Sequence, residues 1–153
     1  MKKLFILFIG FILFTSCNND DDASPVNSSI VGEWTLTKLN AKMDIGIAQS
    51  VGEGKNYNAS MSFTENPNQV SSQGTVVLEQ KLYMNGTHIS TEESTIDFTN
   101  QFGTGQWELS GNTITMSGQD SSVSVTVTKL TSNSLIFRYN PDETTVLTFE
   151  FSK

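Results

Sequence analysis

The chain has 153 residues, which is enough for one domain with its own hydrophobic core. Hydrophobic residues make up 37% and charged residues 16%, a composition that excludes a disordered acidic polymer and a membrane protein. The net charge of −7 disfavours nucleic acids and anionic lipid headgroups as partners, because phosphate groups repel an acidic surface.

Residues 1–16 have the pattern of a secretory signal peptide. Lys2 and Lys3 precede an apolar run at 4–14, and small residues follow that run. The run is too short to span a bilayer, since a helix of this length rises only about 16 Å against a hydrocarbon core of about 30 Å. Removal of the signal would leave 7 basic and 16 acidic residues, a net charge of −9.

Cys17 is the only cysteine, so an intramolecular disulfide is impossible, and a free thiol would be a liability in an exported protein. The stretch LFTSC at 13–17 resembles a bacterial lipobox. This resemblance implies that Cys17 becomes the first mature residue and carries acyl chains such as palmitate, which would anchor the protein to the outer membrane. Simple cleavage of the signal without lipidation is the alternative.

Residues 17–29 predict a solvated tether, because they lack apolar periodicity. Asp20, Asp21 and Asp22 resemble the surface-export signal of lipoproteins in some Gram-negative bacteria, which implies display at the cell surface. The alternative is that repulsion among the three aspartates only keeps the tether extended. A calcium site is not expected here, since the turn glycine and the spaced ligands of a calcium loop are missing.

Period-two alternation dominates residues 30–153 and predicts β-strands. Leu78 and Leu82, for example, fall on one face of a strand, and Glu79 and Lys81 fall on the other. Turn signals separate such runs at 85–86 (NG), 110–112 (SGN), 131–134 (TSNS) and 140–143 (NPDE). We therefore expect one all-β domain, an up-and-down antiparallel barrel of about eight to ten strands, because closure removes exposed strand edges.

Two segments of the domain lack clean alternation and are predicted to be connections, namely 40–58 and 65–74. In the first, Met43, Ile45 and Ile47 are candidates for a lid over a barrel mouth. The alternative is an irregular surface loop whose apolar residues pack on the barrel wall. No helix is predicted, and Ile96 and Phe98 are assigned to one face of a strand.

The stretches GEWTL at 32–36 and GQWEL at 105–109 share the pattern Gly-x-Trp-x-Leu. The glycines allow the backbone to bend or to approach a neighbour closely where a strand begins. Trp34 and Trp107 each share a strand face with the leucine two positions later. The pattern predicts two strands that contribute large side chains to one core.

Three stretches in this order, IVGEWTLTKLN, GTGQWELSGNTITMSG and VTVTKLTSNSLIFRY, resemble the lipocalin-like domains of bacterial lipoproteins. The resemblance implies a barrel of about eight strands with one open mouth, which either holds a small ligand or is filled by its own side chains. In the wider lipocalin family the first-strand tryptophan packs beside a basic residue of a late strand. Arg138, the only arginine, is therefore the candidate to stack on Trp34.

Catalysis is not predicted. His88 is the only histidine, so a histidine-rich zinc site is excluded by number, and no metal or cofactor is expected. Glu92 and Glu93 would point to opposite faces of a strand, which does not suit a pair of catalytic carboxylates. A hydrolase remains a third hypothesis that requires His88 to be buried beside a carboxylate and a hydroxyl.

The leading hypothesis is a non-enzymatic, membrane-anchored binding protein whose barrel takes a small apolar or amphipathic molecule. The alternative is a solid barrel that contacts a protein or a glycan through its surface, and an exposed patch of Tyr57, Tyr83 and Phe102 would favour it. The residues predicted to line or plug the cavity are Trp34, Met61, Phe63, Leu82, Trp107 and Phe137.

Overall fold

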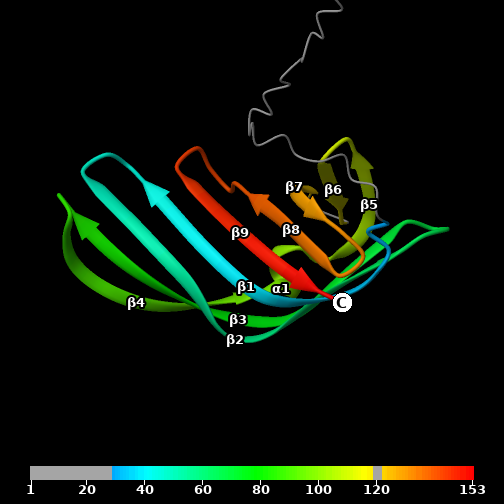
Figure 1. The fold of residues 1–153 in the computed structure, drawn as a ribbon, viewed down its shortest axis with the longest axis horizontal. Helices are drawn as coiled ribbons and strands as arrows, with labels where there is room; N and C mark the ends of the chain where they lie inside the picture. Colours follow the sequence, from blue (N-terminus) through cyan, green and yellow to red (C-terminus); the bar gives the residue numbers. More distant parts are fainter. Residues whose placement is uncertain (1–28, 119–121) are drawn as a thin grey trace, which may run out of the picture.

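The computed structural model describes residues 29–118 and 122–153, so the predicted signal peptide, Cys17 and the tether up to residue 28 lie outside the described residues. The described residues form antiparallel strands and one short helix (Figure 1). The elements are β1 (Gly32–Asp44), β2 (Ala48–Thr64), β3 (Gln69–Met84), β4 (Thr87–Asp97), α1 (Phe98–Gln101), β5 (Thr104–Ser110), β6 (Thr113–Ser117), β7 (Ser122–Leu130), β8 (Ser134–Tyr139) and β9 (Thr145–Ser152). Within these ranges no helix is long and apolar enough to cross a membrane.

The strands form a ring of hydrogen-bonded neighbours. The order β2-β1-β9-β8-β7-β6-β5-β3 returns to its start because β2 also pairs with β3. The strand β4 lies outside this ring and pairs with β3 alone. The predicted all-β antiparallel barrel is therefore confirmed, with one strand added at its side.

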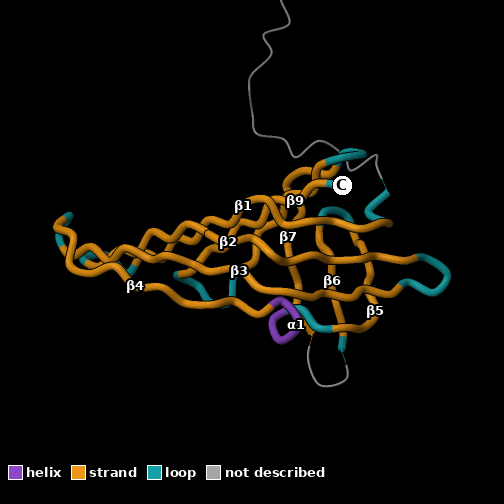
Figure 2. Tube along the Cα trace, turned by 90° about the horizontal axis from the view of Figure 1, so that it is seen from below, coloured by secondary structure: helices purple, strands orange, loops and turns teal. Residues whose placement is uncertain are grey.

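One edge of β3 is shared by two partners, and this divides the molecule into two regions. At the start of β3, the residues Gln69–Ser71 pair with β5 and close the ring. Farther along, Thr75–Met84 pair with β4 instead. The barrel thus closes at one end, while β1 to β4 run on as a curved sheet toward the other end, at the left of Figures 1 and 2.

The helix α1 is a departure from the sequence prediction, because Phe98 begins a helical turn and does not continue a strand. Asp97 caps this turn, and its carboxylate accepts hydrogen bonds from the backbone N–H of Thr99 at 2.8 Å and of Asn100 at 3.3 Å. The turn carries the chain from β4 back to the same edge of β3, where β5 begins. Phe98 and Phe102 are buried in the barrel as a result.

The prediction of an irregular connection at 40–58 is also wrong, and the connection predicted at 65–74 is confirmed only at 65–68. The first segment is a hairpin, in which β1 ends at Asp44 and β2 starts at Ala48. The second segment is a turn at 65–68 followed by the start of β3. The buried positions of the hairpin on β2 are Ser50, Gly52 and Gly54, which give no hydrophobic signal, and this is why alternation was hidden there.

Aromatic side chains fill the closed part of the barrel. Phe137, Phe149 and Phe151 pack with ring centroids between 5.2 and 6.5 Å apart. Phe98 and Phe102 pack against the same group in edge-to-face geometry, with centroids 5.2 to 6.2 Å from their neighbours. The interior at this end is therefore occupied by the protein's own side chains.

Trp34 is fully buried, and Lys153 stands beside it in place of the predicted Arg138. The Trp34 indole Nε1 donates a hydrogen bond to the Ile30 carbonyl at 2.7 Å, and Lys153 Nζ lies 4.4 Å from the ring centroid. Lys153 Nζ also donates to the carbonyl of Val31 at 2.8 Å. Arg138 is exposed, because its neighbours in β8 occupy the inward positions. The prediction that Arg138 stacks on Trp34 is wrong.

Candidate functional site

The inner face of the sheet beyond the aromatic core forms an open trough, which we define by two rows of residues that run across five strands. Strand pairing places these residues side by side, and the same face continues into the core at Leu39 and Leu78. From β9 to β4, the rows are Leu147, Ala41, Gly52, Gln80, Glu92 and Thr145, Met43, Ser50, Leu82, Ser90.

The β1 and β9 side of the trough is mainly apolar, with Leu147, Ala41 and Met43. The β3 and β4 side is mainly polar, with Gln80, Glu92 and Ser90, and Leu82 is its one apolar residue. The floor on β2 consists of the small residues Ser50 and Gly52. Six of its residues line a pocket of about 220 Å³: Met43, Ser50, Gln80, Leu82, Ser90 and Glu92. This volume is below the range of about 300 to 1,000 Å³ that is usual for drug-sized ligands, so the pocket suits a chain or a head group.

Gly52 keeps the floor of the trough low. A Cβ atom at this position would come within 2.9 Å of Leu78 Cδ1 and within 3.0 Å of the Ala41 Cβ. The neighbouring floor position is Ser50, whose side chain is small. Small side chains on β2 therefore leave room between the apolar side and the polar side.

Charged groups are distributed unevenly between the two faces of this sheet. On the outer face Lys55 bonds to Glu79 and lies 3.8 Å from Glu93, and Lys81 lies 3.9 Å from Glu79. The hydrogen bond from Lys55 holds the pKa of Glu79 below its ordinary value and raises the pKa of Lys55 itself. In the two rows of the trough, Glu92 is the only charged residue.

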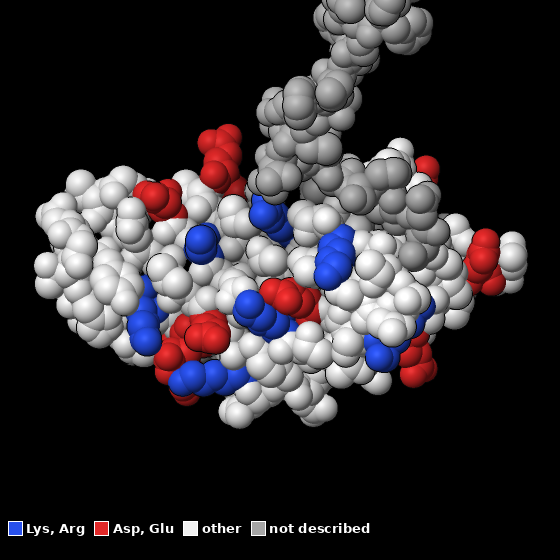
Figure 3. All heavy atoms as spheres, in the orientation of Figure 1, with Lys and Arg blue, Asp and Glu red and all other residues white. Residues whose placement is uncertain are grey.

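The rim of the trough is apolar and exposed. Ile45 and Ile47 are 56% and 68% exposed at the β1–β2 turn, and Met84 and Ile89 are 45% and 55% exposed beside the β3–β4 turn. The backbone N–H of Asn85 donates to the carbonyl of Ile47 at 2.8 Å, which ties the two hairpin tips together. In Figure 3 this end of the molecule, at the left, carries few charged side chains.

Comparison with known proteins gives one result that decides the family. A family model described as "Lipocalin-like domain" matches residues 30–137. This chain belongs to the lipocalin-like domain family. No curated protein and no solved structure matches the chain. The matched residues end within β8, so β9, which completes the ring between β1 and β8, lies outside the matched residues.

The lipocalin-like barrel places the predicted cavity residues in three different surroundings. Trp34, Met61, Phe63 and Phe137 are almost completely buried and belong to one packed core. Leu82 is the one predicted residue that lies in the trough. The last of the set, Trp107 of β5, is half-buried where β5 separates from β3.

The predicted lid residues and the predicted aromatic patch are also separated. Met43 lines the pocket, whereas Ile45 and Ile47 stand beyond it at the hairpin tip. Phe102 is buried in the barrel, so it does not join Tyr57 and Tyr83 in an exposed patch.

Sequence reasoning missed the polar side of the trough. This side consists of Gln80, Ser90 and Glu92. The one signal for it in the sequence is at Gln80, which shares a strand face with Leu78 and Leu82. A polar residue at an inward position is easily taken for an interruption of the pattern. Here it marks the place where the core ends.

His88 is exposed on β4, outside the trough. Its Nε2 atom lies 3.0 Å from Thr91 Oγ1, and its ring packs edge-on against Tyr83 with centroids 5.6 Å apart. The hydrolase hypothesis required His88 to be buried beside a carboxylate and a hydroxyl, and an exposed His88 beside the Thr91 hydroxyl does not meet that requirement. No group of three residues that could hold a metal ion occurs among residues 29–118 and 122–153.

Proposed function

We propose that this lipocalin-like protein binds a small amphipathic molecule in the trough, as a binding protein and not as an enzyme. The observation that carries the proposal is the composition of the trough: an inner sheet face beyond the core, with an apolar side, a polar side and a floor of small residues. Pockets of this mixed character fix an apolar ligand and orient its polar group.

The apolar and the polar residues of the trough would have separate tasks. Met43, Leu82 and Leu147 offer apolar contact, and each 100 Å² of apolar surface removed from water contributes about 2.5 kcal/mol. Ser90 and Gln80 offer hydroxyl and amide groups to the polar end of the ligand. A ligand without a polar end would leave these groups dehydrated and without partners, which is unfavourable.

The exposed rim supports the same proposal. Single exposed apolar residues are normal on protein surfaces, but Ile45, Ile47 and Met84 gather at the mouth of one pocket. An apolar chain that extends past Leu82 would cover them. Their role as a lid that closes over the ligand is part of this proposal.

We further propose that lipidation of Cys17 anchors the protein at the outer membrane. In support, the described chain begins next to Trp34, whereas the trough residues of β1, Ala41 and Met43, lie seven and nine residues farther along the strand, about 23 to 30 Å away. A tether attached at the Trp34 end would leave the trough accessible. Mass analysis of the processed protein tests this point, since acylation adds a defined mass that Cys17→Ala must abolish.

A pair of adjacent substitutions tests the binding proposal. Ser50→Phe would fill the pocket, whereas Val51→Phe adds the same ring on the outer face of β2, where Val51 is already exposed. The fluorescence of N-phenyl-1-naphthylamine should rise on binding to the natural chain and to the Val51→Phe variant. We expect Ser50→Phe to weaken this binding at least tenfold while the variant stays folded.

Two results would count against the proposal. One is equal binding of N-phenyl-1-naphthylamine by the Ser50→Phe and Val51→Phe variants, which would place the molecule outside the trough. The other is an absence of binding by the natural chain together with a bare polypeptide mass in native mass spectrometry after purification from a bacterial host.

A further inference from the structure

The one charged side chain in the two rows of the trough is acidic. Glu92 of β4 lines the pocket together with Gln80 and Ser90, and the other residues of the rows are neutral. Glu92 is exposed on the open side of the trough, so a ligand can reach its carboxylate. It takes part in none of the ion pairs found within residues 29–118 and 122–153. A ligand in the trough therefore meets a negative charge that no ion pair of these residues compensates.

The lysines that neighbour trough residues in the chain lie on the opposite face of the sheet. Lys42 and Lys81 alternate with trough residues along β1 and β3, and successive side chains of a strand point to opposite faces. On that outer face Lys55 bonds to Glu79, and Lys81 lies 3.9 Å from Glu79. The sheet thus separates these lysines from Glu92, so they offer no partner to an anionic head group in the trough.

The polar side of the trough suits an ammonium group. A primary ammonium has three N–H donors and no acceptor, so it is best satisfied by several oxygen atoms. Strand pairing places the amide of Gln80 beside the Glu92 carboxylate, and the Ser90 hydroxyl lies two residues earlier on the same strand face. All three side chains line one pocket. A carboxylate or phosphate head group would instead be repelled by Glu92.

The order of the two rows gives such a ligand a direction. Glu92 belongs to the row that lies next to the barrel, whereas Leu82 and Met43 belong to the row nearer the hairpin tips. The exposed rim, which includes Met84, lies farther along in the same direction. An ammonium group at Glu92 therefore leaves the apolar chain of the ligand to run past Leu82 toward the rim, where both apolar surfaces are removed from water.

We propose that the trough selects a cationic amphiphile, namely a primary amine with an apolar chain, and that Glu92 determines this preference. The inference rests on the function proposed for the trough and adds to it the charge of the ligand. Fatty acids would bind more weakly than amines of the same chain length.

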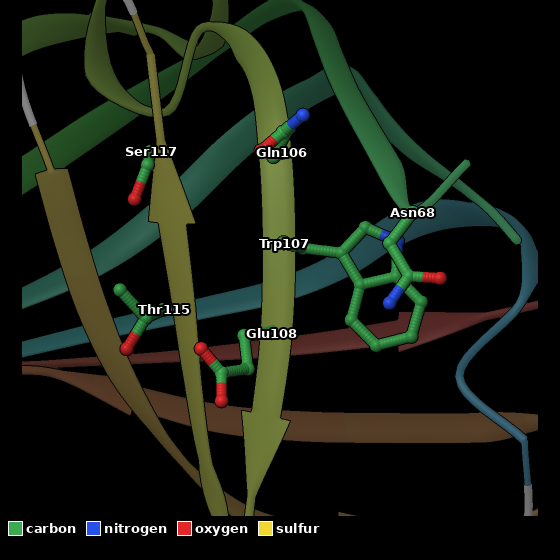
Figure 4. Close-up of a pocket in the computed structure, with 6 residues that line it drawn as sticks. All are labelled: Asn68, Gln106, Trp107, Glu108, Thr115 and Ser117. Carbon is green, nitrogen blue, oxygen red and sulfur yellow. The ribbon is translucent and has the colours of Figure 1, made fainter. Parts of the chain in front are cut away.

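A second pocket with an acidic residue provides a comparison within the molecule. It has a volume of about 380 Å³ and lies on β5 and β6, where Glu108 pairs with Thr115. In Figure 4 the Glu108 side chain extends from β5 toward Thr115, whereas the Trp107 ring extends to the other side of the strand. Among the described residues that line this pocket there is no leucine, isoleucine, valine or methionine. It therefore presents a carboxylate without the aliphatic surface of the trough.

Competition for the trough tests the preference. N-phenyl-1-naphthylamine is bound to the purified natural chain and is displaced at pH 7 with decylammonium, decanoate or decan-1-ol, which share a ten-carbon chain. The amine is protonated and the acid is ionised at this pH. We expect decylammonium to displace the dye at a concentration at least tenfold lower than decanoate does, with decan-1-ol between them.

Three substitutions that each remove one negative charge locate the origin of the preference. Glu92→Gln should reduce the ratio of the decanoate and decylammonium concentrations to below about threefold. Glu93→Gln is the matched control, because Glu93 is the next residue in the chain and lies 3.8 Å from Lys55 on the outer face. Glu108→Gln is the control for an acidic pocket without aliphatic residues. Both control variants should keep the ratio of the natural chain.

The outcomes separate this proposal from the function proposed for the trough. Equal displacement by decylammonium and decanoate, or stronger displacement by decanoate, would overturn the cation preference and leave the trough as a binding site. An equal loss of preference in a control variant would assign it to the net charge of the protein.

An undiminished preference in Glu92→Gln would also overturn the proposal. If that variant self-associated in addition, Glu92 would have the different role of protecting the free edge of β4 against a further strand. If N-phenyl-1-naphthylamine does not bind to the natural chain at all, the function proposed for the trough fails, and the cation preference fails with it.

Discussion

The closed barrel and the open trough are built from the same strands, yet one is a packed core and the other a lined pocket. In β9, Phe149 lies in the aromatic core, and Leu147, two residues earlier on the same face, lies in the trough. In β1, Leu39 and Met43 differ in the same way. The alternation of a strand decides which residues face inward, but the strands that cross above that face decide whether they become core.

The edge of β3 makes this difference. Where β3 pairs with β5, the chain continues through β6 and β7 and covers the aromatic residues. Where β3 pairs with β4, the sheet ends at β4, and the inner face of the sheet stays open as the trough. The comparison predicts that substitutions in the barrel act mainly on stability and that substitutions in the trough act mainly on binding.

The largest effect is expected from a pair of substitutions in β9. Phe149→Ala should lower the free energy of unfolding by about 3 to 5 kcal/mol, because it leaves a cavity among packed rings. Leu147→Ala should cost less than about 2 kcal/mol, since Leu147 is only half-buried, and it should weaken ligand binding. Urea unfolding measures both values, and equal losses would show that the two regions do not differ in packing.

Two glycines sharpen the comparison at the level of the backbone. A Cβ on Gly105 would lie 2.0 Å from the Ser117 carbonyl oxygen, which is held by strand pairing, whereas a Cβ on Gly52 would meet mainly side chains that can move. Gly105→Ala should therefore destabilise the fold by about 3 kcal/mol, and Gly52→Ala by less than about 1.5 kcal/mol. A larger loss of unfolding free energy for Gly52→Ala in the same urea experiment would show that the side chains around Gly52 cannot move aside.

A smaller effect is expected at the Trp34 end of the barrel. Lys153→Met removes the charge above the Trp34 ring and the hydrogen bond to Val31, and should cost about 1 kcal/mol. Lys129→Met on β7 is the control, because Lys129 is exposed and should change stability by less than about 0.5 kcal/mol. Equal thermal stability of the two variants would refute the stabilising role of Lys153.

The smallest effect on stability is expected from protonation of the Asp142 carboxylate at acid pH. Hydrogen bonds from Thr144 and Thr145 hold the pKa of Asp142 below its ordinary value. Because the folded pKa is the lower one, Asp142 stabilises the fold above the ordinary carboxyl range, and this stabilisation is lost as the pH falls through the folded pKa. The urea midpoint of Asp142→Asn should fall less between pH 7 and pH 3 than that of the natural chain, and parallel curves would exclude this contribution.

The sequence predicted much of the barrel and little of the trough, for physical reasons. Alternation predicted the strands of the domain and placed Met61, Phe63 and Phe137 in its interior, because a buried strand face must be apolar. It did not identify α1, since one helical turn at Phe98 is too short to show a helical period.

The trough was hidden because its floor and its polar side break the apolar pattern at Ser50, Gly52 and Gln80. The cation beside Trp34 was open to prediction, since Lys153 shares the strand parity of Phe149 and Phe151, whereas Arg138 has the opposite parity to Phe137. The pairing of β3 with both β4 and β5 involves residues far apart in the chain, and no local pattern reports it.

The central claim is that the ligand binds in the trough and that the barrel stays closed. Four methionines of the described residues test it directly, because Met43 and Met84 lie at the open end, and Met61 and Met116 are buried in the barrel. Methyl NMR on methionine-labelled protein is recorded while N-phenyl-1-naphthylamine is added. The account predicts that the Met43 and Met84 signals shift with saturation and that the Met61 and Met116 signals stay in place. Shifts of Met61 and Met116 without shifts of Met43 and Met84 would contradict it.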